Sequence, residues 1–377
     1  MQRREFLDAT VAALAACALP SVAWAEGGGD VLLQHAGSPQ NLGTATPYFD
    51  RLITPTPAFF VRSHFGPPAL DPARKLKISG MVKSPLELGV DGLRKFKEVT
   101  LTAVLQCSGN GRALQEPRVP GLQWIHGGMA QATWTGVRLV DVLQKAGIDP
   151  AAAHVRLAGA DAPPKPTTPA FLRSIPAARA LDPSTLLAYR MNGEPLTLAH
   201  GAPIRLIVPG WSGNHWVKWL TDVRVQNEEA EGFYMQTAYR QPKQPVAPGA
   251  SVPPDQMVPV TTFPVKSIIG RPADGGRAKV GPQEIAGVAF SGEAAIARVE
   301  VSTDGGSTWN EAKLEGEAGA GRWQVFRHAF TADKPGPCRA VARATDARGA
   351  TQPEKAVWNP SGYFWNGWHR TSWTVES

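Results

Sequence analysis

The chain has 377 residues, which is long enough for two domains that each bury a hydrophobic core. Its composition is 43% hydrophobic and 19% charged, and 34 prolines with 38 glycines favour short strands and many turns over long helices. The formal charge is +7, but no dense run of lysine and arginine interleaved with aromatic residues is present. We therefore set nucleic-acid binding aside. The moderate basic excess is consistent with an acidic protein partner or an anionic substrate, and equally with a role in solubility alone.

The first 25 residues are predicted to be an export signal. Two arginines and a Phe-Leu pair within residues 3–7 precede a small-residue apolar stretch, and Ala-Trp-Ala at 23–25 forms a cleavage site. The paired arginines are typical of a twin-arginine signal, which exports folded proteins, and they predict a periplasmic location. An ordinary secretory signal is the alternative, and Cys17 offers lipid attachment in place of cleavage after Ala25. No later segment is apolar enough to predict a membrane span.

The first part of the mature chain, residues 26–250, is predicted to mix strands and helices. Residues 76–96 read as a strand, a turn and a short helix. Residues 132–148 read as a turn that leads into a helix, which Gly147 ends. The apolar face of that helix is expected to consist of Val137, Leu139, Val140, Val142 and Leu143. Further strands are predicted over 99–107, 154–160, 203–210 and 216–226.

The second part, residues 251–377, is predicted to be an immunoglobulin-like β-sandwich. A proline-rich stretch over 240–260 precedes it and reads as a linker or a long ordered crossover. Residues 295–314 then alternate in polarity on both sides of an Asp-Gly-Gly turn, as in a β-hairpin. Short strands with glycine turns continue to residue 349, a pattern typical of such a sandwich. The sequence as a whole predicts an α+β protein with a mixed first domain and a sandwich second domain.

Two cysteines, Cys107 and Cys338, remain after the predicted cleavage. In an oxidising compartment they predict a disulfide by default, and an exported two-domain binding protein with a Cys107–Cys338 bridge is one reading. Two observations oppose it. Cys338 alternates with small residues in a predicted sandwich strand and suits a packed inner face. Cys107 lies in the other predicted domain, where a strand ends at Ser-Gly-Asn-Gly, and a nearby cation such as Arg112 favours the thiolate that binds a metal.

Basic side chains in the first domain occur where the backbone is constrained. Arg62 and His64 share one face of an extended segment, and His200 and Arg205 enclose a Gly-Ala-Pro turn. Lys218 lies between two tryptophans. Each residue alone reads as a structural or surface group, but together they predict an anion site, because arginine grips oxyanions with two parallel hydrogen bonds. The sequence has no zinc-ligand spacing, phosphate-binding loop or Gly-x-Ser-x-Gly motif. It also lacks the Cys-x-x-Cys-His motif that attaches haem, so no haem is expected on this chain.

Nine segments, in order and with suitable gaps, resemble the sulfite oxidase family of molybdenum enzymes. Six of them resemble the family's molybdenum domain: QCSGNGR (106–112), GLQW (121–124), WTGVRLVDVL (134–143), LLAYRMNGEPL (186–196), HGAPIRLIVPG (200–210) and WVKWL (216–220). Three resemble its C-terminal dimerisation domain: VKSII (265–269), VEVSTDGGSTW (299–309) and NPSGYFWNGWHR (359–370). The resemblance covers most of residues 45–372 and implies a homodimer.

The resemblance implies a molybdopterin cofactor and specific roles for residues of this chain. Cys107 matches the cysteine whose soft thiolate ligates molybdenum. Arg62, Arg112 and Trp124 match positions that line the sulfite pocket, and Tyr239 matches the tyrosine beside the metal. The implied catalytic residues are thus Cys107, Tyr239, Arg62 and Arg112. The positions that bind the pterin and its phosphate are matched by His64, Cys107, Asp161, Ser174, His200, Arg205 and Lys218.

One position departs from the family pattern. Relatives usually have a further pocket arginine within or just after the segment NPSGYF, where this chain has Ser361 and Phe364. The departure predicts either that another basic group such as Arg370 serves the pocket, or that the substrate differs from sulfite.

The predicted function is that of a bacterial periplasmic sulfite dehydrogenase. The resemblance implies that the protein oxidises sulfite to sulfate. It also implies that the electrons pass to an external c-type cytochrome, because no haem or flavin module is expected beside the molybdenum domain. The alternative is a molybdenum oxidoreductase of the same fold that acts on another sulfur compound or on a sulfoxide.

Overall fold

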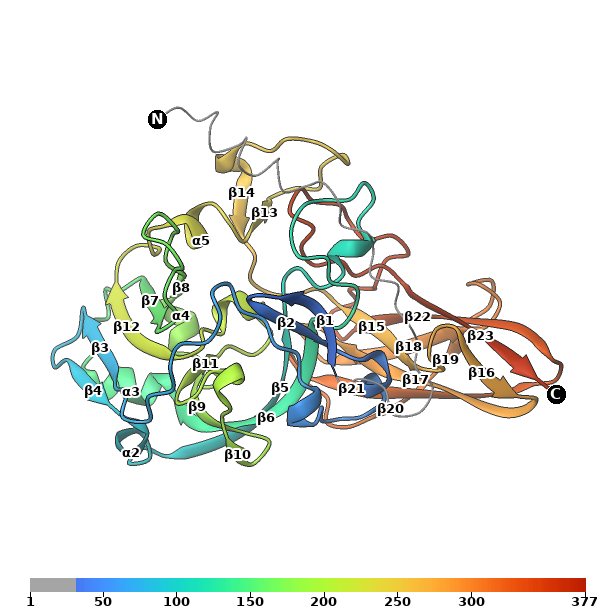
Figure 1. The fold of residues 1–377 in the computed structure, drawn as a ribbon, viewed down its shortest axis with the longest axis horizontal. Helices are drawn as coiled ribbons and strands as arrows, with labels where there is room; N and C mark the ends of the chain where they lie inside the picture. Colours follow the sequence, from blue (N-terminus) through green and yellow to red (C-terminus); the bar gives the residue numbers. More distant parts are fainter. Residues whose placement is uncertain (1–31) are drawn as a thin grey trace. The chain divides into compact units, whose positions relative to one another are not determined.

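The computed structural model describes residues 32–377 (Figure 1). The predicted export signal over 1–25, including Cys17, lies outside these residues. In the described part of the chain, no helix combines the length and the apolar character that a membrane crossing requires.

The N-terminal region contains two five-stranded sheets, a β-hairpin and four short α-helices. The first sheet has the strand order β10-β9-β6-β5, with β11 also paired to β9, and the second has the order β4-β3-β12-β7-β8. The hairpin consists of β1 (Leu32–Gly37) and β2 (Gln40–Thr44). The first sheet contains β5 (Glu98–Gln106), β6 (Met129–Arg138), β9 (Leu186–Met191), β10 (Glu194–Pro195) and β11 (Arg205–Ile207). The second contains β3 (Leu76–Gly80), β4 (Leu86–Leu88), β7 (His154–Gly159), β8 (Leu172–Pro176) and β12 (Leu220–Gln226). The helices are α2 (Val90–Leu93), α3 (Leu139–Ala146), α4 (Ala177–Ala180) and α5 (Phe233–Gln236).

The segment over 132–148 departs from its prediction. Residues 132–138 belong to β6, which pairs with β5 from Glu98↔Val137 to Gln106↔Met129, so this stretch is a strand and not a turn. The helix α3 begins only at Leu139. Alternation of threonine with buried apolar side chains suits a pleated strand, which explains the difference. The end of the helix agrees with the prediction, because Gly147 caps it with a φ of 71°.

Two other predicted strands are shorter than expected. The strand predicted over 203–210 is reduced to β11. The strand predicted over 216–226 begins at Leu220, because Trp219 has a left-handed backbone with a φ of 50° that interrupts an extended chain.

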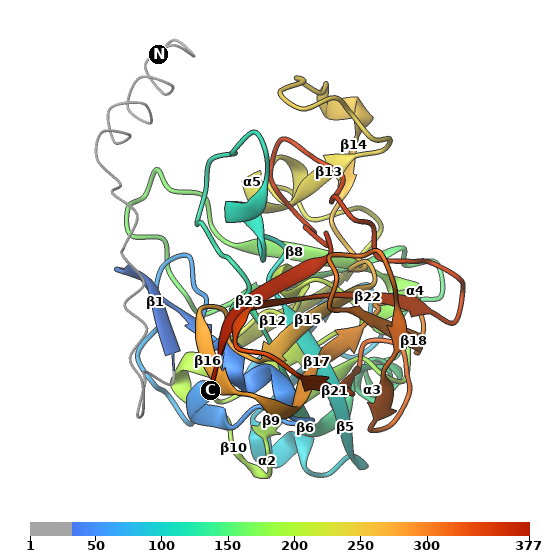
Figure 2. The same ribbon diagram turned by 90° about the vertical axis from the view of Figure 1, so that its right-hand side faces the viewer.

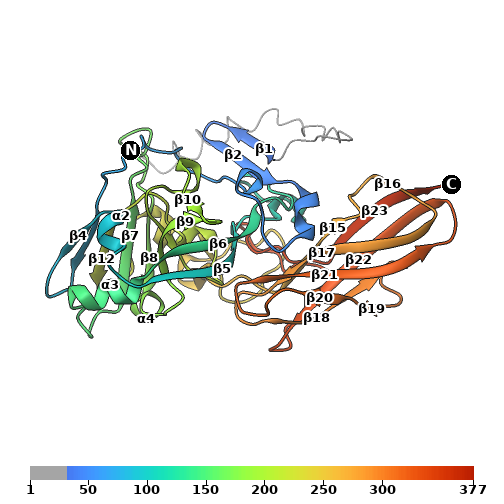
Figure 3. The same ribbon diagram turned by 90° about the horizontal axis from the view of Figure 1, so that it is seen from below.

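The C-terminal region is a sandwich of two sheets, as predicted. One sheet has the order β15-β17-β21-β20 and the other β16-β23-β22-β18-β19, and the two lie face to face (Figures 2 and 3). The first contains β15 (Lys266–Arg271), β17 (Gly281–Phe290), β20 (Lys313–Glu315) and β21 (Trp323–Ala332). The second contains β16 (Gly276–Lys279), β18 (Ile296–Ser302), β19 (Asn310–Glu311), β22 (Gly336–Asp346) and β23 (His369–Glu376).

The predicted inner face of β22 is confirmed. Ala340, Ala342 and Ala344 are fully buried between the sheets, and Cys338 is half-buried at the end of the same row. Cys338 and Cys107 are both free thiols, so the alternative with a Cys107–Cys338 disulfide is wrong. The α+β class, with a mixed first part and a sandwich second part, is confirmed.

The proline-rich stretch is an ordered hairpin. Within it, β13 (Arg240–Pro242) pairs with β14 (Met257–Pro259), from Arg240↔Pro259 to Pro242↔Met257. The stretch therefore turns back on itself and returns the chain to Tyr239, whose carbonyl accepts a hydrogen bond from the Val260 N–H (2.8 Å).

The two regions share buried side chains and hydrogen bonds. A common apolar cluster joins Val104 and Met129 of the first sheet to Ile268 and Phe290 of the sandwich, and β5 and β6 run toward the sandwich strands in Figure 1. Gln131 on β6 crosses the boundary. Its amide oxygen accepts from the Trp323 N–H (2.7 Å), and its amide nitrogen donates to the carbonyls of Leu52 (2.9 Å) and Trp323 (3.2 Å). Gln131 is 2% exposed, so these bonds are closed to water.

Replacement of Gln131 tests how strongly the two regions depend on each other. Gln131→Ala leaves the buried N–H of Trp323 without an acceptor, and we expect the free energy of unfolding to fall by about 2–3 kcal/mol. Denaturant unfolding measures this loss. The control Gln256→Ala removes an exposed glutamine, and we expect a change within about 0.5 kcal/mol. Equal midpoints for the two variants would contradict the interpretation.

Candidate active site

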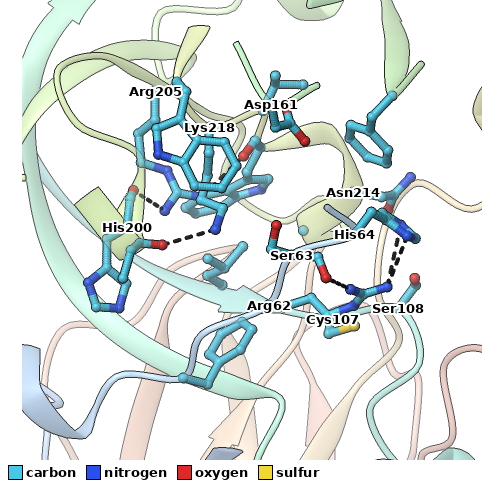
Figure 4. Close-up of a pocket in the computed structure, with 18 of the residues that line it drawn as sticks. Arg62, Ser63, His64, Cys107, Ser108, Asp161, His200, Arg205, Asn214 and Lys218 are labelled. Atoms are coloured by element: carbon cyan, nitrogen blue, oxygen red, sulfur yellow. Dashed lines mark hydrogen bonds between the residues drawn. The ribbon is translucent and has the colours of Figure 1, made fainter. Parts of the chain in front are cut away.

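A pocket opens where the ends of several strands meet, beside the Cys107 thiol. Figure 4 shows Arg62 next to Cys107, and His200, Arg205 and Lys218 together on another wall. The walls come from the segment before β3, the end of β5, the loop after β7, and the segments on either side of β11. Eight of the residues predicted for the site line the pocket: Arg62, His64, Cys107, Asp161, His200, Arg205, Lys218 and Tyr239.

Cys107 is fixed by its own backbone and by the tight turn that follows. Its N–H donates to the Gly128 carbonyl (2.8 Å), and its carbonyl accepts from the Asn110 N–H (3.0 Å). Gly111 must be glycine, because its φ is 93° and a Cβ atom there would lie 2.7 Å from the Cβ of Trp365. The half-buried thiol is thus presented at the end of β5 on a backbone with little freedom to move.

Arg62, His64 and Tyr239 form a chain of polar contacts. The Arg62 guanidinium donates to the Asn41 side-chain oxygen (3.2 Å) and to the Ser63 carbonyl, and its second terminal nitrogen lies 3.2 Å from His64 Nδ1. His64 Nε2 lies 2.6 Å from the Tyr239 hydroxyl. Burial, together with the nearby Arg62 charge, lowers the pKa of His64 to about 2, so its imidazole is neutral at physiological pH.

The neutral His64 links the guanidinium to the phenol. The second terminal nitrogen of Arg62, which can only donate, lies 3.2 Å from Nδ1 and 3.4 Å from Nε2 of His64, and the Tyr239 hydroxyl is the other partner of Nε2. Burial also raises the pKa of Tyr239 above its usual value, so the phenol keeps its proton. Tyr239 has a φ of 58°, a strained backbone conformation of the kind found at functional sites.

A second wall carries two cations, the buried Arg205 and the half-buried Lys218. The terminal nitrogens of Arg205 donate to the carbonyls of His200 (2.9 Å) and Trp216 (3.1 Å), and Lys218 Nζ donates to the Ala199 carbonyl (2.9 Å). Burial lowers the pKa of Arg205 to about 9. Burial and the Arg205 charge lower the pKa of Lys218 to about 7. Two cations without a hydrogen-bonded carboxylate form a site that gains stability from a bound anion.

His200 and Asp161 complete this wall without neutralising it. His200 Nδ1 lies 2.7 Å from the Thr197 hydroxyl, and burial together with the Arg205 charge lowers the pKa of His200 to about 4. Burial raises the pKa of Asp161, and the nearby Lys218 charge opposes that shift. The pocket therefore holds neutral imidazoles and positive charges, with one carboxyl group at its edge.

Unpartnered polar atoms in the pocket wall also point to a polar ligand. The Ser108 hydroxyl and both side-chain amide atoms of Asn214 are buried and have no hydrogen-bond partner among the described residues. Buried polar atoms are rarely left without partners, so these atoms fit a ligand that donates and accepts hydrogen bonds.

Three predicted site residues do not line the pocket. Trp124 is fully buried in the core against Phe60 and His35. The Ser174 hydroxyl accepts from the Ala230 N–H (2.8 Å) and supports the backbone. Arg112 donates to the carbonyls of Ser361 (2.9 Å) and Leu122 (3.1 Å), and so joins the turn after Cys107 to the C-terminal loop.

The structure also shows the contacts of Ser361 and Phe364, the residues that depart from the family pattern. Ser361 meets Arg112 through its backbone carbonyl, and Phe364 is buried with its N–H donated to the Ser108 carbonyl (2.9 Å). Arg370 does not serve the pocket. Arg370 lies on β23, and its guanidinium pairs with Glu354 (2.8 Å), both side chains being exposed.

Comparison with known proteins decides the family. Residues 64–234 match the model of the oxidoreductase molybdopterin binding domain, and residues 258–376 match the Mo-co oxidoreductase dimerisation domain. Sulfite oxidase of Arabidopsis thaliana is 33% identical over 343 residues, which cover 84% of this chain and 87% of the plant protein. This chain belongs to the sulfite oxidase family. The mitochondrial sulfite oxidase of Rattus norvegicus is 40% identical over 336 residues, which cover 84% of this chain and 61% of the rat protein. This chain therefore matches less than two thirds of the length of the mammalian relatives.

A solved structure has the same fold over nearly the whole chain. The sulfane dehydrogenase SoxCD from Paracoccus pantotrophus superposes with a TM-score of 0.78 at 28% identity, covering 92% of this chain and 89% of that chain. The family assignment and this likeness agree with the two-region architecture described above.

The pocket of this family member fits a molybdopterin cofactor on the evidence of its own side chains. Cys107 offers a free, soft thiol to the metal. Arg205 and Lys218 suit the phosphate of the pterin, and the unpartnered atoms of Ser108 and Asn214 suit its polar ring.

Sequence reasoning missed Asn214, Tyr363 and Arg173. Asn214 lies between two segments that carried the resemblance, and its Gly-Asn-His context after a strand was an available signal. Tyr363 lies inside the segment NPSGYF, in which only Ser361 and Phe364 were predicted to bear on the pocket. Arg173 gave no signal, because its environment is created by contacts with Tyr234, His215 and Tyr239, all distant in sequence.

The lowered pKa of Lys218 predicts pH-dependent anion binding. In the full chain produced without cofactor, we expect sulfate to bind about fivefold more weakly at about pH 8.5 than at about pH 6. The reason is that Lys218 loses its proton through a pKa of about 7, while Arg205 stays largely charged and His200 stays neutral. Calorimetric titration with sulfate, itself a dianion over this range, measures the effect. Lys218→Met should abolish the pH dependence, and a variant that kept it would assign it to another group.

Proposed function

We propose that this protein oxidises sulfite to sulfate with a molybdenum cofactor in the periplasm and passes the electrons to an external c-type cytochrome. The observation that carries the proposal is a free thiol at Cys107 beside Arg62, in a pocket whose other wall holds the buried Arg205 and the half-buried Lys218. Such a pocket suits both an anionic cofactor and an anionic substrate. The relatives named sulfite oxidase, at 33–40% identity, support the choice of substrate.

The reaction has a simple balance. Sulfite and water give sulfate, two protons and two electrons, so one turnover reduces two one-electron acceptors. When bound, the molybdenum cofactor supplies oxygen-atom transfer and stores the two electrons. The Cys107 thiolate would hold the metal, and Arg205, Lys218, Ser108 and Asn214 would hold the pterin and its phosphate.

The polar chain around Arg62 positions the substrate and handles a proton. The Arg62 charge attracts sulfite into a partly desolvated pocket, where a fixed cation orients an oxyanion better than water does. Tyr239 lines the pocket, and the neutral His64 holds its phenol in place (2.6 Å). The raised pKa of Tyr239 favours a hydrogen-bond donor over a phenolate, whose negative charge would repel sulfite.

Location and assembly are part of the proposal. The twin-arginine pattern at the N-terminus supports export of the folded protein to the periplasm. The match to a dimerisation domain over 258–376 supports a homodimer formed through the sandwich. The net charge of +7 supports docking of an acidic face of the cytochrome.

A second candidate is oxidation of another sulfur compound by the same site. Ser361 stands where a pocket arginine is expected, and Arg370 does not replace it. The structural likeness to a protein named sulfane dehydrogenase supports this candidate.

The deciding experiment compares substrates on one preparation of the purified protein. We expect molybdenum bound in stoichiometric amount and sulfite-dependent reduction of both ferricyanide and a c-type cytochrome. Cys107→Ser should lower turnover by at least about a thousandfold, because serine does not offer a soft thiolate to the metal.

The outcomes separate the candidates. Molybdenum-loaded protein that is inert toward sulfite but oxidises a sulfane compound or reduces a sulfoxide would move the function to the second candidate. Protein without bound molybdenum that still oxidises sulfite would contradict the proposed chemistry altogether.

Arg62 and Arg112 should differ in their kinetic effect. Arg62→Gln removes a charge that lines the pocket, and we expect KM for sulfite to rise about thirtyfold with a smaller change in kcat. Arg112→Gln removes a group bonded to two backbone carbonyls, and we expect a rise in KM of less than about fivefold. Steady-state kinetics measures both, and a larger KM effect at Arg112 would place its guanidinium in the substrate site.

A further inference from the structure

Arg173 is a fully buried arginine behind the pocket, on strand β8. Its exposed fraction is 0%, and its guanidinium carbon lies 5.4 Å from the centre of the Tyr239 ring. One terminal nitrogen donates to the Tyr234 carbonyl, and the other lies 3.2 Å from His215 Nε2. These contacts fix the guanidinium against the face of the phenol that lines the pocket.

The charge of Arg173 has no counter-ion of its own. Among residues 32–377 it forms no salt bridge, and the nearby Glu229 pairs with Arg240 instead (3.3 Å). Its Nε is buried without a hydrogen-bond partner. Burial lowers its pKa to about 10, so it remains a cation at neutral pH. An unpaired buried charge is costly to a fold, and a bound anion nearby offsets that cost.

Two stacked tyrosines each have an arginine over the ring. Tyr239 stacks on Tyr363 with ring centres 5.7 Å apart and an interplanar angle of 12°, and the Arg112 guanidinium lies 5.3 Å from the Tyr363 ring. Arg173 thus belongs to the same unit that presents the Tyr239 hydroxyl to the pocket. This unit meets the C-terminal loop at Ser361, whose carbonyl accepts from Arg112 and which stands where the family resemblance places a pocket arginine.

We infer that Arg173 supplies, from behind Tyr239, the positive charge that Ser361 does not provide, and that it sets the preference of the pocket for a dianion. The inference rests on the proposed function. Arg173 acts through Tyr239 and does not line the pocket, so it is a positioning residue.

A charge placed in this way has a distinct signature. Its interaction with a ligand scales with the ligand charge, so a dianion gains about twice the interaction energy of a monoanion at the same place. Loss of the charge must therefore weaken sulfate binding more than nitrate binding. A purely structural role for Arg173 would weaken the two alike or lower the amount of folded protein.

The test measures binding of sulfate and nitrate to the holoenzyme by calorimetry, together with sulfite kinetics. For Arg173→Met we expect sulfate affinity to fall about tenfold, nitrate affinity to fall about threefold, and KM for sulfite to rise more than kcat falls. Arg173→Lys retains the charge and should restore sulfate affinity to within about threefold of the wild type. Arg173→Gln serves as a second neutral variant, since its amide can still donate to the Tyr234 carbonyl.

Arg179 provides the matched control. It also donates to a backbone carbonyl, that of Pro209, and lies over an aromatic ring, 5.5 Å from the centre of Trp211. Unlike Arg173, it pairs with a carboxylate, Asp182 (3.1 Å). Arg179→Met should leave sulfate and nitrate affinities unchanged.

Three results would overturn the inference: neutral variants that bind sulfate as the wild type does, equal losses for sulfate and nitrate, or a lysine variant as weak as methionine. A wild-type protein that binds no sulfate would overturn it as well. A wild-type protein that binds sulfate but does not oxidise sulfite would reject the proposed function alone, since the binding data still report on Arg173.

Discussion

Positive charge buried without matching negative charge is the constraint on which this pocket depends. Arg205, Lys218 and Arg173 are held by backbone carbonyls and aromatic faces and not by hydrogen-bonded carboxylates. The fold tolerates this because each cation is fixed by elements that are themselves tightly packed. The resulting field selects anions before any specific contact forms. Burial, reinforced by the charge of Arg62 at His64 and of Arg205 at His200, lowers the pKa of both histidines and keeps them neutral, so that they serve as hydrogen-bonding groups.

Local patterns in the sequence predicted the elements that present the site. The apolar run over 99–107 predicted β5, and the glycines after it predicted the turn that exposes Cys107. The sandwich followed from alternation and glycine turns in the same way. The strand over 132–138 was mistaken for a turn, because its burial on both faces depends on β5 and β9, which the local sequence does not reveal.

The composition of the pocket wall was harder to predict, because it depends on contacts between distant segments. Motif matches placed Arg112, Trp124 and Ser174 near the site along the chain, but a motif does not say which way a side chain faces. The role of Arg173 could not be predicted from local sequence, because the pairing of β7 with β8 brings it behind Tyr239. Tyr363 contacts Tyr239 only because the C-terminal loop folds back onto this part of the chain. The two tyrosines are 124 residues apart in sequence.

The bond between Arg112 and the Ser361 carbonyl spans 249 residues of chain. It ties the turn beside the cysteine to a loop that follows the sandwich strand β22, so the N-terminal region alone would leave this turn without one of its anchors. A chain truncated within the sandwich would lose its anchor for the Cys107 turn, and the capacity to retain a cofactor would thereby report on the integrity of the whole polypeptide.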